Sequence, residues 1–150
     1  MPDIFVDAEA CPVKQEVYRV ARRYGLKVML IANSPMNIPP EDGISLVVVK
    51  GQMDAADDWI VSHAARNDIV ITADIPLAAR CLKIGVRVLE PKGRVFTEAT
   101  ISSALANRDI MTYLRNTGID TSGPAPFEKR DRSLFLQSLD KVIRSMGDGK

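Results

Sequence analysis

Short apolar runs alternate with segments of helical periodicity along the first two-thirds of the chain. The runs are rich in β-branched residues, which is typical of strands. They predict strands over residues 3–7, 27–32, 45–49, 69–72 and 86–89. Between these runs, apolar side chains recur at helical spacing and predict helices over residues 12–24, 54–65 and 74–82.

This alternation of strands and helices predicts an α/β fold. Successive strands separated by helices form parallel sheets, so we expect a three-layer sandwich with a mainly parallel central sheet and helices on both faces. The run Ile69–Thr72 supports this prediction, because consecutive apolar residues suit a strand that is buried on both faces. A chain of 150 residues suits one domain, so residues 1–150 are expected to form a single unit.

The pattern changes after Thr97, where two longer helical stretches replace the alternation. They span about residues 97–114 and 131–146 and are predicted as two extra C-terminal helices. We therefore expect a core of about residues 1–95 and a helical extension of about residues 96–146. The segment 116–129 between the two helices is rich in Gly, Pro, Thr and Ser and is predicted to be an ordered loop or a lid.

Four aspartates are predicted to meet at one edge of the sheet. Asp7 follows the first strand, Asp74 follows the strand at 69–72, and Asp54 and Asp57 open a helix just after another strand. Residues just past the carboxyl ends of parallel strands converge on one crevice. Carboxylates gathered there repel one another unless a hard divalent cation lies between them. The pattern predicts a Mg²⁺ or Mn²⁺ site, in which the metal activates a water molecule to attack a phosphodiester.

Each of these acids also has a structural interpretation. Asp74 and Asp54 each precede a helix and can cap it by accepting a hydrogen bond from a backbone N–H group. Asp57 and Asp58 lie in the first turn of their helix, where the macrodipole favours negative charge. Asp7 is harder to explain in this way, because the small residues that follow it leave room for a ligand.

Helical geometry separates the acids of the second helix. The buried stripe of this helix is expected to consist of Ala56, Ile60 and Ala64. Asp57 then lies at the flank of the stripe, whereas Asp58 points further toward solvent. Asp57 is therefore the better candidate for a metal ligand, and Asp58 is expected to be a solvated neighbour.

Two further polar residues are candidates at the same edge. Glu9 brings another carboxylate within reach of the crevice, close to Asp7 in the sequence. Asn33 ends the second strand and either orients substrate or water or is an ordinary turn residue. The one histidine, His63, follows Trp59 at helical spacing and is expected to pack near the core or at its edge, which gives a histidine base little support.

The distribution of charge bears on the partner. A net charge of +1 does not by itself predict a nucleic-acid binder. Basic residues nevertheless concentrate in the last third of the chain, and a basic surface beside an acidic pocket suits a phosphate-bearing polymer such as RNA. Arg108, Arg115 and Arg132 are the candidates for phosphate contact, with solvation of a helix surface as the alternative. No feature of the sequence specifies a protein partner or an oligomeric state.

Signatures of several other protein classes are absent from the sequence. There is no glycine-rich dinucleotide fingerprint, no P-loop and no nucleophile elbow around a serine. No apolar run reaches the ~18 residues of a membrane span and the N-terminus leads directly into a strand, so we expect a cytoplasmic protein without a membrane partner. Cys11 and Cys81 are too few and too far apart for a zinc motif. Cys11 is expected to be a small buried residue, with a reactive thiol as the alternative.

Several motifs resemble one family of bacterial proteins. The motifs are Asp7–Pro12, Asp54–Asp57, Asp68–Ala78, Arg108–Met111, Gly123–Pro124 and Asp131–Phe135. Together they extend over nearly the whole chain and resemble the YaiI/YqxD family. That family usually has aspartate at the position of Glu9, so this chain keeps the negative charge there and lengthens the side chain.

The acids also resemble those of PIN-domain nucleases. These enzymes have an aspartate after the first strand, an acid shortly before an Ile-containing helical stretch and an acid after a strand of the Ile-Val-Ile-Thr kind. The matching residues here are Asp7, Asp57 and Asp74. Many PIN nucleases have another aspartate two positions later, where this chain has Pro76, so Asp54 or Glu9 would have to supply that ligand. The resemblance implies a PIN-like fold and Mg²⁺- or Mn²⁺-dependent cleavage of RNA.

The leading functional hypothesis is a metal-dependent nuclease that acts on RNA. Its metal ligands and catalytic residues would be Asp7, Asp54, Asp57 and Asp74. A second hypothesis, supported by Pro76, is a non-catalytic PIN-like module that binds nucleic acid or protein. A third hypothesis is a small-molecule phosphatase, because the same carboxylates suit phosphomonoester hydrolysis.

Overall fold

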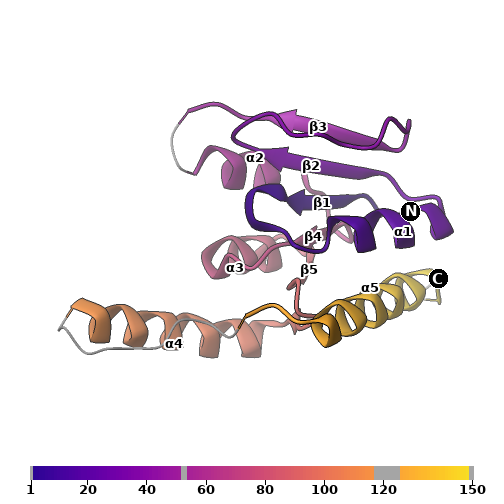
Figure 1. The fold of residues 1–150 in the computed structure, drawn as a ribbon. Coiled ribbons are helices and arrows are strands. Elements are labelled where there is room, and N and C mark those ends of the chain that lie inside the picture. Colours follow the sequence, from indigo (N-terminus) through magenta and orange to yellow (C-terminus); the bar gives the residue numbers. More distant parts are fainter. Residues whose placement is uncertain (1, 52–53, 117–125, 149–150) are drawn as a thin grey trace.

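The computed structural model describes residues 2–51, 54–116 and 126–148. Within these ranges, six strands form one sheet in the order β3-β2-β1-β4-β5-β6, with helices on both faces (Figure 1). The strands are β1 (Ile4–Asp7), β2 (Val28–Ala32), β3 (Ile44–Val48), β4 (Ile69–Ile71), β5 (Arg87–Leu89) and β6 (Val95–Phe96). The helices are the short 3₁₀ helix η1 (Ala8–Ala10), α1 (Lys14–Tyr24), α2 (Ala55–His63), α3 (Ile75–Lys83), α4 (Glu98–Asn116) and α5 (Lys129–Asp148).

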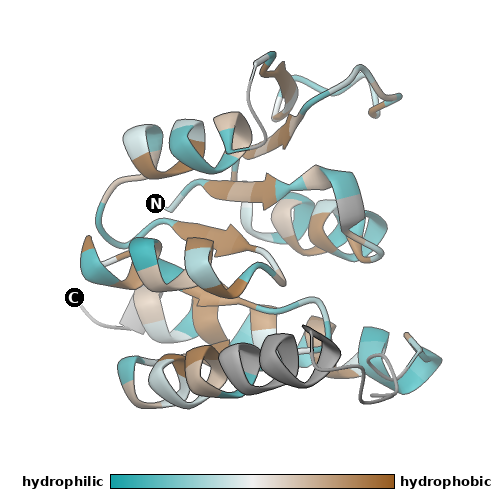
Figure 2. Cartoon of the chain, turned by 90° about the vertical axis from the view of Figure 1, so that its left-hand side faces the viewer, coloured by the Kyte–Doolittle hydropathy of each residue, from teal (hydrophilic) through white to brown (hydrophobic). Residues whose placement is uncertain are grey.

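The predicted α/β sandwich with a mainly parallel sheet is confirmed. Neighbouring strands run parallel except for β5 and β6, which are antiparallel. Figure 2 shows predominantly hydrophobic strands between helices that carry both hydrophobic and hydrophilic residues. Parallel strands with helices on both faces bury both faces of the sheet, which explains the long apolar runs in the sequence.

Alternation along β1 divides the core into two layers. Ile4 packs in one cluster with Val17 of α1 and Phe135 of α5. Its neighbour Phe5 points to the opposite face and packs in a second cluster with Ile60 of α2. Helices α1 and α5 therefore cover one face of the sheet, and α2, α3 and α4 cover the other.

Helix α1 follows its sequence pattern closely. Val17 and Val20 are buried on its inner side, as their spacing predicts. The helix ends at Gly25, whose φ of 66° lies in the left-handed region that glycine adopts at low cost. It begins at Lys14 and not at Pro12, because Val13 at its N-cap has a non-helical backbone (φ −114°, ψ 25°).

The sequence pattern does not predict β6 or η1. Elements of two and three residues are too short to display any periodicity. Strand β6 exists because the chain reverses after β5, where the N–H group of Gly93 donates to the carbonyl of Glu90 at 2.8 Å. Gly93 has a φ of 99°, and the turn brings Val95 and Phe96 against β5.

The two C-terminal helices pack against opposite faces of the sandwich. Ile101 and Ala104 of α4 are buried in the same cluster as residues of α3. Phe135 and Leu139 of α5 are fully buried in the cluster that contains β1, so α5 completes a layer of the core. Most of the predicted loop or lid, residues 117–125, lies outside the described residues. In the described part of the chain, no helix has the length and apolar composition needed to cross a membrane.

We expect Leu139→Ala to lower the free energy of unfolding by about 2–5 kcal/mol, because it empties a fully buried position between α5 and the sheet. Leu134→Ala on the same helix is the matched control, since Leu134 is 47% exposed. Its expected cost is below about 1 kcal/mol. Urea unfolding followed by far-UV circular dichroism measures both values. Equal costs would contradict the assignment of α5 to the core.

Candidate functional site

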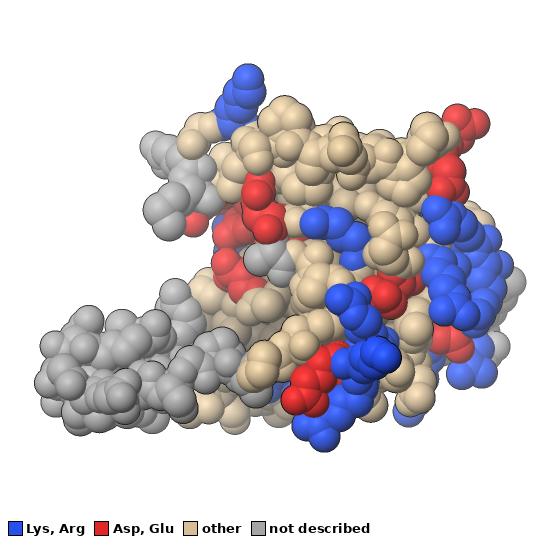
Figure 3. Space-filling view, in the orientation of Figure 1, with Lys and Arg blue, Asp and Glu red and all other residues tan. Residues whose placement is uncertain are grey.

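Asp7 lies at the point where the order of the strands reverses. From β1 the chain continues to β2 on one side, whereas β4 and β5 lie on the other side, so the carboxyl ends of β1 and β4 flank a topological switch point. Val6 pairs with Ile71, which puts Asp7, the last residue of β1, level with Thr72. Figure 3 shows acidic side chains gathered in a hollow at the end toward which the strand arrows of Figure 1 point.

Thr72 connects the two strand ends through its hydroxyl group. In the described part of the chain, it is the one polar residue that is buried, with 1% of its surface exposed. Its Oγ1 donates to Oδ2 of Asp7 at 2.9 Å and accepts from the backbone N–H group of Asp74 at 3.0 Å. Oδ1 of Asp74 in turn accepts from the N–H group of Leu77 at 2.9 Å and caps α3, as its structural interpretation predicts.

The apolar pattern of the sequence does not predict the part that Thr72 plays at the site. In that pattern Thr72 is only the last residue of an apolar strand. The signal that would have found it is a hydroxyl residue two positions before Asp74, a spacing at which serine and threonine side chains accept from the backbone. Its contact with Asp7 spans 65 positions and has no local signal.

Asp57 faces the same crevice from α2. Burial, followed by the negative charges of Asp74, Asp7 and Asp54, raises its pKa to about 6, against a lowering effect of Arg80. The predicted orientation of the helix is confirmed, because Ala56, Ile60 and Ala64 are buried and Asp57 is half-buried. Asp58 is exposed and forms an ion pair with Arg80 at 2.9 Å, so it points away from the crevice.

Asp54 lies at the rim of the crevice. It occupies the N-cap position of α2, but its exposed side chain makes no capping hydrogen bond, so the expected cap is not formed. Its charge nevertheless contributes to the raised pKa of Asp57. We refer to Asp7, Asp54, Asp57 and Asp74 together as the acidic edge.

Burial and repulsion also act on Asp7. Burial is the largest influence and raises its pKa, the hydrogen bond from Thr72 lowers it, and the charges of Asp74 and Glu9 raise it. The charge of Asp74 thus raises the pKa of both Asp7 and Asp57, although the three residues come from different elements. The acidic edge therefore holds negative charge at a cost that an added cation would relieve.

Glu9 lies next to the acidic edge, and one of its oxygens already has backbone partners. Oε1 of Glu9 accepts from the N–H groups of Asn33 and Ser34, the latter at 3.2 Å. These bonds tie η1 to the end of β2. Asn33 is exposed at this end of the sheet, and its backbone, not its side chain, makes the contact with Glu9.

The arginine candidates for phosphate contact differ in what the structure describes. Arg132 of α5 donates to the carbonyl of Pro12 at 2.7 Å and to Oε1 of Glu16 at 3.0 Å, and its guanidinium lies 5.0 Å from the ring centre of Phe127. It therefore fastens α5 to the start of α1. The side chains of Arg108 and Arg115, both in α4, lie outside the described part of the structure.

The surroundings of His63 and Cys11 indicate structural roles for both side chains. His63 is exposed at the end of α2, where its ring stacks on Trp59 at 3.8 Å between centroids and Nδ1 lies 2.8 Å from the Trp59 carbonyl. Cys11 is buried, and this burial raises the pKa of its thiol to about 11. The burial of Cys11 confirms the prediction of a small buried residue. The raised pKa disfavours the alternative of a reactive thiol, because the thiolate is the nucleophile.

The donor groups of the acidic edge fit a hydrated cation better than an enclosed metal. Among the described residues, no three acidic, histidine or cysteine side chains are arranged to hold a metal ion by themselves. Mg²⁺ usually keeps several waters and takes only one or two carboxylates together with substrate phosphate. Asp7 and Asp74 each use one carboxylate oxygen, and the other oxygen of each has no hydrogen-bond partner within the described ranges.

We expect Asp57→Asn to stabilise the protein at pH 8 and to have little effect at pH 4. The folded-state pKa of Asp57, about 6, lies above the ordinary aspartate value of 3.8. Its contribution to stability is therefore complete below about pH 4 and is lost as the pH rises through about 6. Since Asp57 is partly exposed, the expected gain at pH 8 is about 1 kcal/mol, measured by urea unfolding.

Asp58→Asn is the matched control for this experiment. Asp58 is the next residue in the same helical turn, is exposed and has Arg80 as its partner. Its substitution is expected to change the free energy of unfolding by less than about 0.5 kcal/mol at either pH. A loss of stability in Asp57→Asn at pH 8 would show that the charged carboxylate makes a favourable contact, contrary to this account.

Comparison with known proteins agrees with the sequence motifs. A family profile described as "Uncharacterized BCR, YaiI/YqxD family" matches residues 5–145. The chain is 53% identical to a UPF0178 protein of Rhodospirillum centenum over 154 aligned positions, which cover all of both chains. It is 53% identical to a UPF0178 protein of Azorhizobium caulinodans and 52% identical to one of Brucella ovis, each over 93% of this chain and 88% of the relative. The match extends over nearly the whole sandwich, acidic edge included, and the chain belongs to the YaiI/YqxD family.

Proposed function

We propose that the protein is a Mg²⁺- or Mn²⁺-dependent nuclease that cleaves RNA at the acidic edge. The observation that carries this proposal is the chain of hydrogen bonds from Asp7 through Thr72 to Asp74 at the switch point of the sheet. Ligand sites of open α/β sheets lie at such points. Asp57 adds a third carboxylate whose pKa responds to both of the others.

A divalent cation is the ligand that this charge distribution favours. The negative charge of Asp74 raises the pKa of both Asp7 and Asp57, so these three carboxylates are costly to keep ionised together, and a hard cation with oxygen preference relieves that cost. Zinc would prefer histidine and cysteine ligands. The one histidine stacks on Trp59, and the buried Cys11 thiol has a raised pKa.

Each residue of the acidic edge has a distinct part in this proposal. Thr72 fixes the orientation of the Asp7 carboxylate, and the N–H group of Leu77 fixes that of Asp74, so one oxygen of each is held ready for a ligand. Asp57 must lose its proton to bind a cation, so affinity should increase as the pH rises through about 6. Asp54 lies at the exposed rim and would bind through water. The bound ion would supply Lewis-acid stabilisation of the charge that grows on the phosphate and would lower the pKa of a water molecule.

The resemblance to PIN-domain nucleases supports RNA as the substrate class. Asp7, Asp57 and Asp74 match the acids of that class in type and in order along the chain. Pro76, where many PIN nucleases have another aspartate, lies in the first turn of α3. Proline suits that position because the N–H group it lacks has no partner within the helix. The set of ligands proposed here is therefore completed by Asp54 and water.

We expect the protein to bind Mn²⁺ with a dissociation constant of about 100 µM or tighter at pH 7.5, measured by isothermal titration calorimetry. Asp7→Asn and Asp74→Asn should each weaken binding at least about tenfold, because each removes one ionised ligand. Asp58→Asn is the control and should leave the affinity unchanged, since Asp58 points away from the crevice toward Arg80. Absence of Mn²⁺ binding by the unaltered protein would contradict the proposal and favour helix capping as the role of these acids.

We expect cleavage of a fluorescently labelled single-stranded RNA in the presence of Mn²⁺, with the rate reduced at least about 100-fold in Asp7→Asn. The Asp58→Asn variant should cleave at the normal rate. Hydrolysis of p-nitrophenyl phosphate without cleavage of RNA would instead identify a small-molecule phosphatase. Binding of Mn²⁺ without either reaction would identify a non-catalytic binding module.

A further inference from the structure

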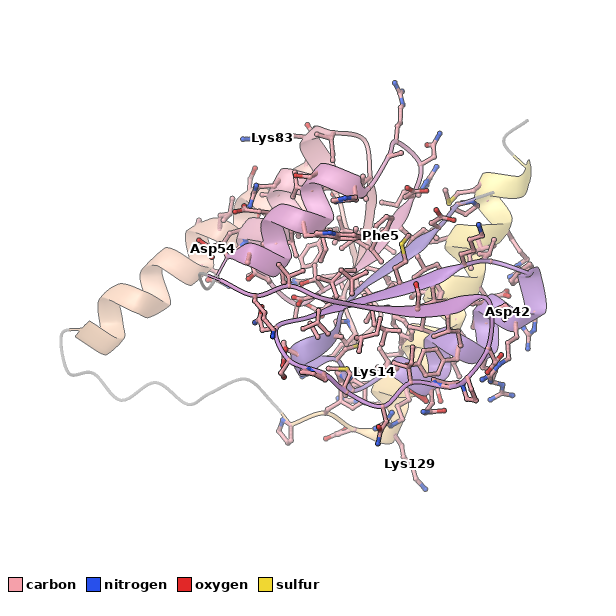
Figure 4. The ribbon with its side chains drawn as sticks, turned by 90° about the horizontal axis from the view of Figure 1, so that it is seen from above. Phe5, Lys14, Asp42, Asp54, Lys83 and Lys129 are labelled. Atoms are coloured by element: carbon pink, nitrogen blue, oxygen red, sulfur yellow. The ribbon has the colours of Figure 1, made fainter. Side chains whose placement is uncertain are left out.

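The outer edge of β3 has no partner strand within the described part of the chain. β3 is the last strand on its side of the sheet and pairs only with β2. It lies at the top of Figure 1 and faces the viewer in Figure 4, which looks down on this side of the molecule. An edge strand presents unpaired N–H and C=O groups, which can pair with a strand of another molecule.

The composition of β3 increases this tendency to pair. Natural edge strands are commonly protected by charged side chains, by proline, by bulges or by shortness. The strand at the other side of the sheet, β6, is two residues long and so has this protection. β3 has five residues, Ile44–Val48, with neither a charge nor a proline, and the side chains of Leu46, Val47 and Val48 are only partly buried. If this edge stayed uncovered, the protein would tend to aggregate through it. We therefore expect a specific partner to cover the edge.

The backbone of β3 determines which residues can pair outward. The carbonyl of Gly43 accepts from the N–H group of Val28 at 2.8 Å, and the N–H group of Val49 donates to the carbonyl of Ala32 at 2.8 Å. Odd-numbered residues thus direct their backbone groups toward β2. Because these directions alternate along a strand, the even-numbered residues direct theirs away from β2, with Leu46 at the centre. The N–H group of Ile44 already donates to the carbonyl of Glu41 at 3.1 Å, so outward pairing relies on Leu46 and Val48.

We infer that β3 pairs with β3 of a second copy of this chain, antiparallel and about a two-fold axis at Leu46. This arrangement puts Leu46 opposite Leu46 of the second copy, with both N–H and C=O groups of each directed to the other. Ile44 then lies opposite Val48 of the second copy, and Ser45 opposite its Val47. The paired side chains are almost all apolar, which suits cross-strand contacts.

Charges at the two ends of β3 favour this antiparallel arrangement. Asp42 lies in the turn before β3 and Lys50 follows its end, so antiparallel pairing about Leu46 brings Asp42 near Lys50 of the second copy, and the symmetry forms this contact twice. Both residues are exposed, and neither forms an ion pair with another described residue. Figure 3 shows the rim over β3 as mostly uncharged, with basic and acidic side chains at opposite ends.

The inferred dimer leaves the acidic edge open. Antiparallel pairing reverses the strand direction between the two copies, so their acidic edges lie at opposite ends of one continuous sheet. Neither copy contributes to the site of the other, and the inference is independent of the proposed function. A ladder of this length buries less surface than a standard interface, so we expect dissociation in the micromolar range.

Sedimentation equilibrium over about 1–200 µM protein tests this interface, and a monomer–dimer equilibrium is expected. Lys50→Glu and Asp42→Lys each bring like charges together at both ends of the ladder and should weaken the dimer about tenfold. The double variant Asp42→Lys/Lys50→Glu restores both attractive contacts and should recover the original affinity. Lys83→Glu, which makes the same charge change on α3, is the control and should have no effect (Figure 4). A monomer at all concentrations, or a dimer insensitive to the two reversals, would overturn the inference.

Oxidation of Leu46→Cys is a second, independent test. Residues that face each other in a hydrogen-bonded antiparallel pair have Cα atoms about 5.5 Å apart, within the range that a disulfide spans. The native Cys11 and Cys81 are buried and do not compete. We expect a covalent dimer on non-reducing gels from Leu46→Cys and little from the exposed control Lys83→Cys. Equal cross-linking of the two variants would place the contact elsewhere and overturn the inference.

Discussion

The hydroxyl group of Thr72 joins the ends of β1 and β4, and the geometry of the acidic edge depends on it. A buried hydroxyl is costly unless it is hydrogen-bonded, and this one both donates to Asp7 and accepts from the N–H group of Asp74. Asp74 then caps α3 through Leu77. One side chain thus sets the orientation of the Asp7 carboxylate, the start of α3 and the separation of two strand ends.

The acidic edge costs stability, and the apolar layers around it offset that cost. Burial and the charges of neighbouring carboxylates raise the pKa values of Asp7 and Asp57, which means that both carboxylates are harder to ionise in the folded protein. Fully buried residues on both faces of β1, such as Ile60 and Phe135, supply the compensating hydrophobic burial. Groups with strongly shifted pKa values in a crevice are typical of functional sites, where stability is given up for chemistry.

The C-terminal helix takes part in the same architecture from the opposite face. Phe135 and Leu139 of α5 pack in the core, and Arg132 reaches the Pro12 carbonyl just after η1. The connection that follows Asp7 is therefore held at Glu9 by the end of β2 and at Pro12 by α5. The side of β3, by contrast, carries no acid of this edge and, among the residues that the structure describes, no covering strand, so association there leaves the acidic edge accessible.

Local sequence determined most elements and the order in which the acids follow them. Periodicity identified the buried side of α2 and so separated Asp57 from Asp58, and Gly25 marked the end of α1. The resemblance of the motifs identified the family. Only the tertiary structure decided which strand ends are neighbours, and with that the contact of Thr72 with Asp7 across 65 positions. The physical reason is that side-chain periodicity reports which face of an element is apolar, whereas packing between elements decides which faces and ends meet.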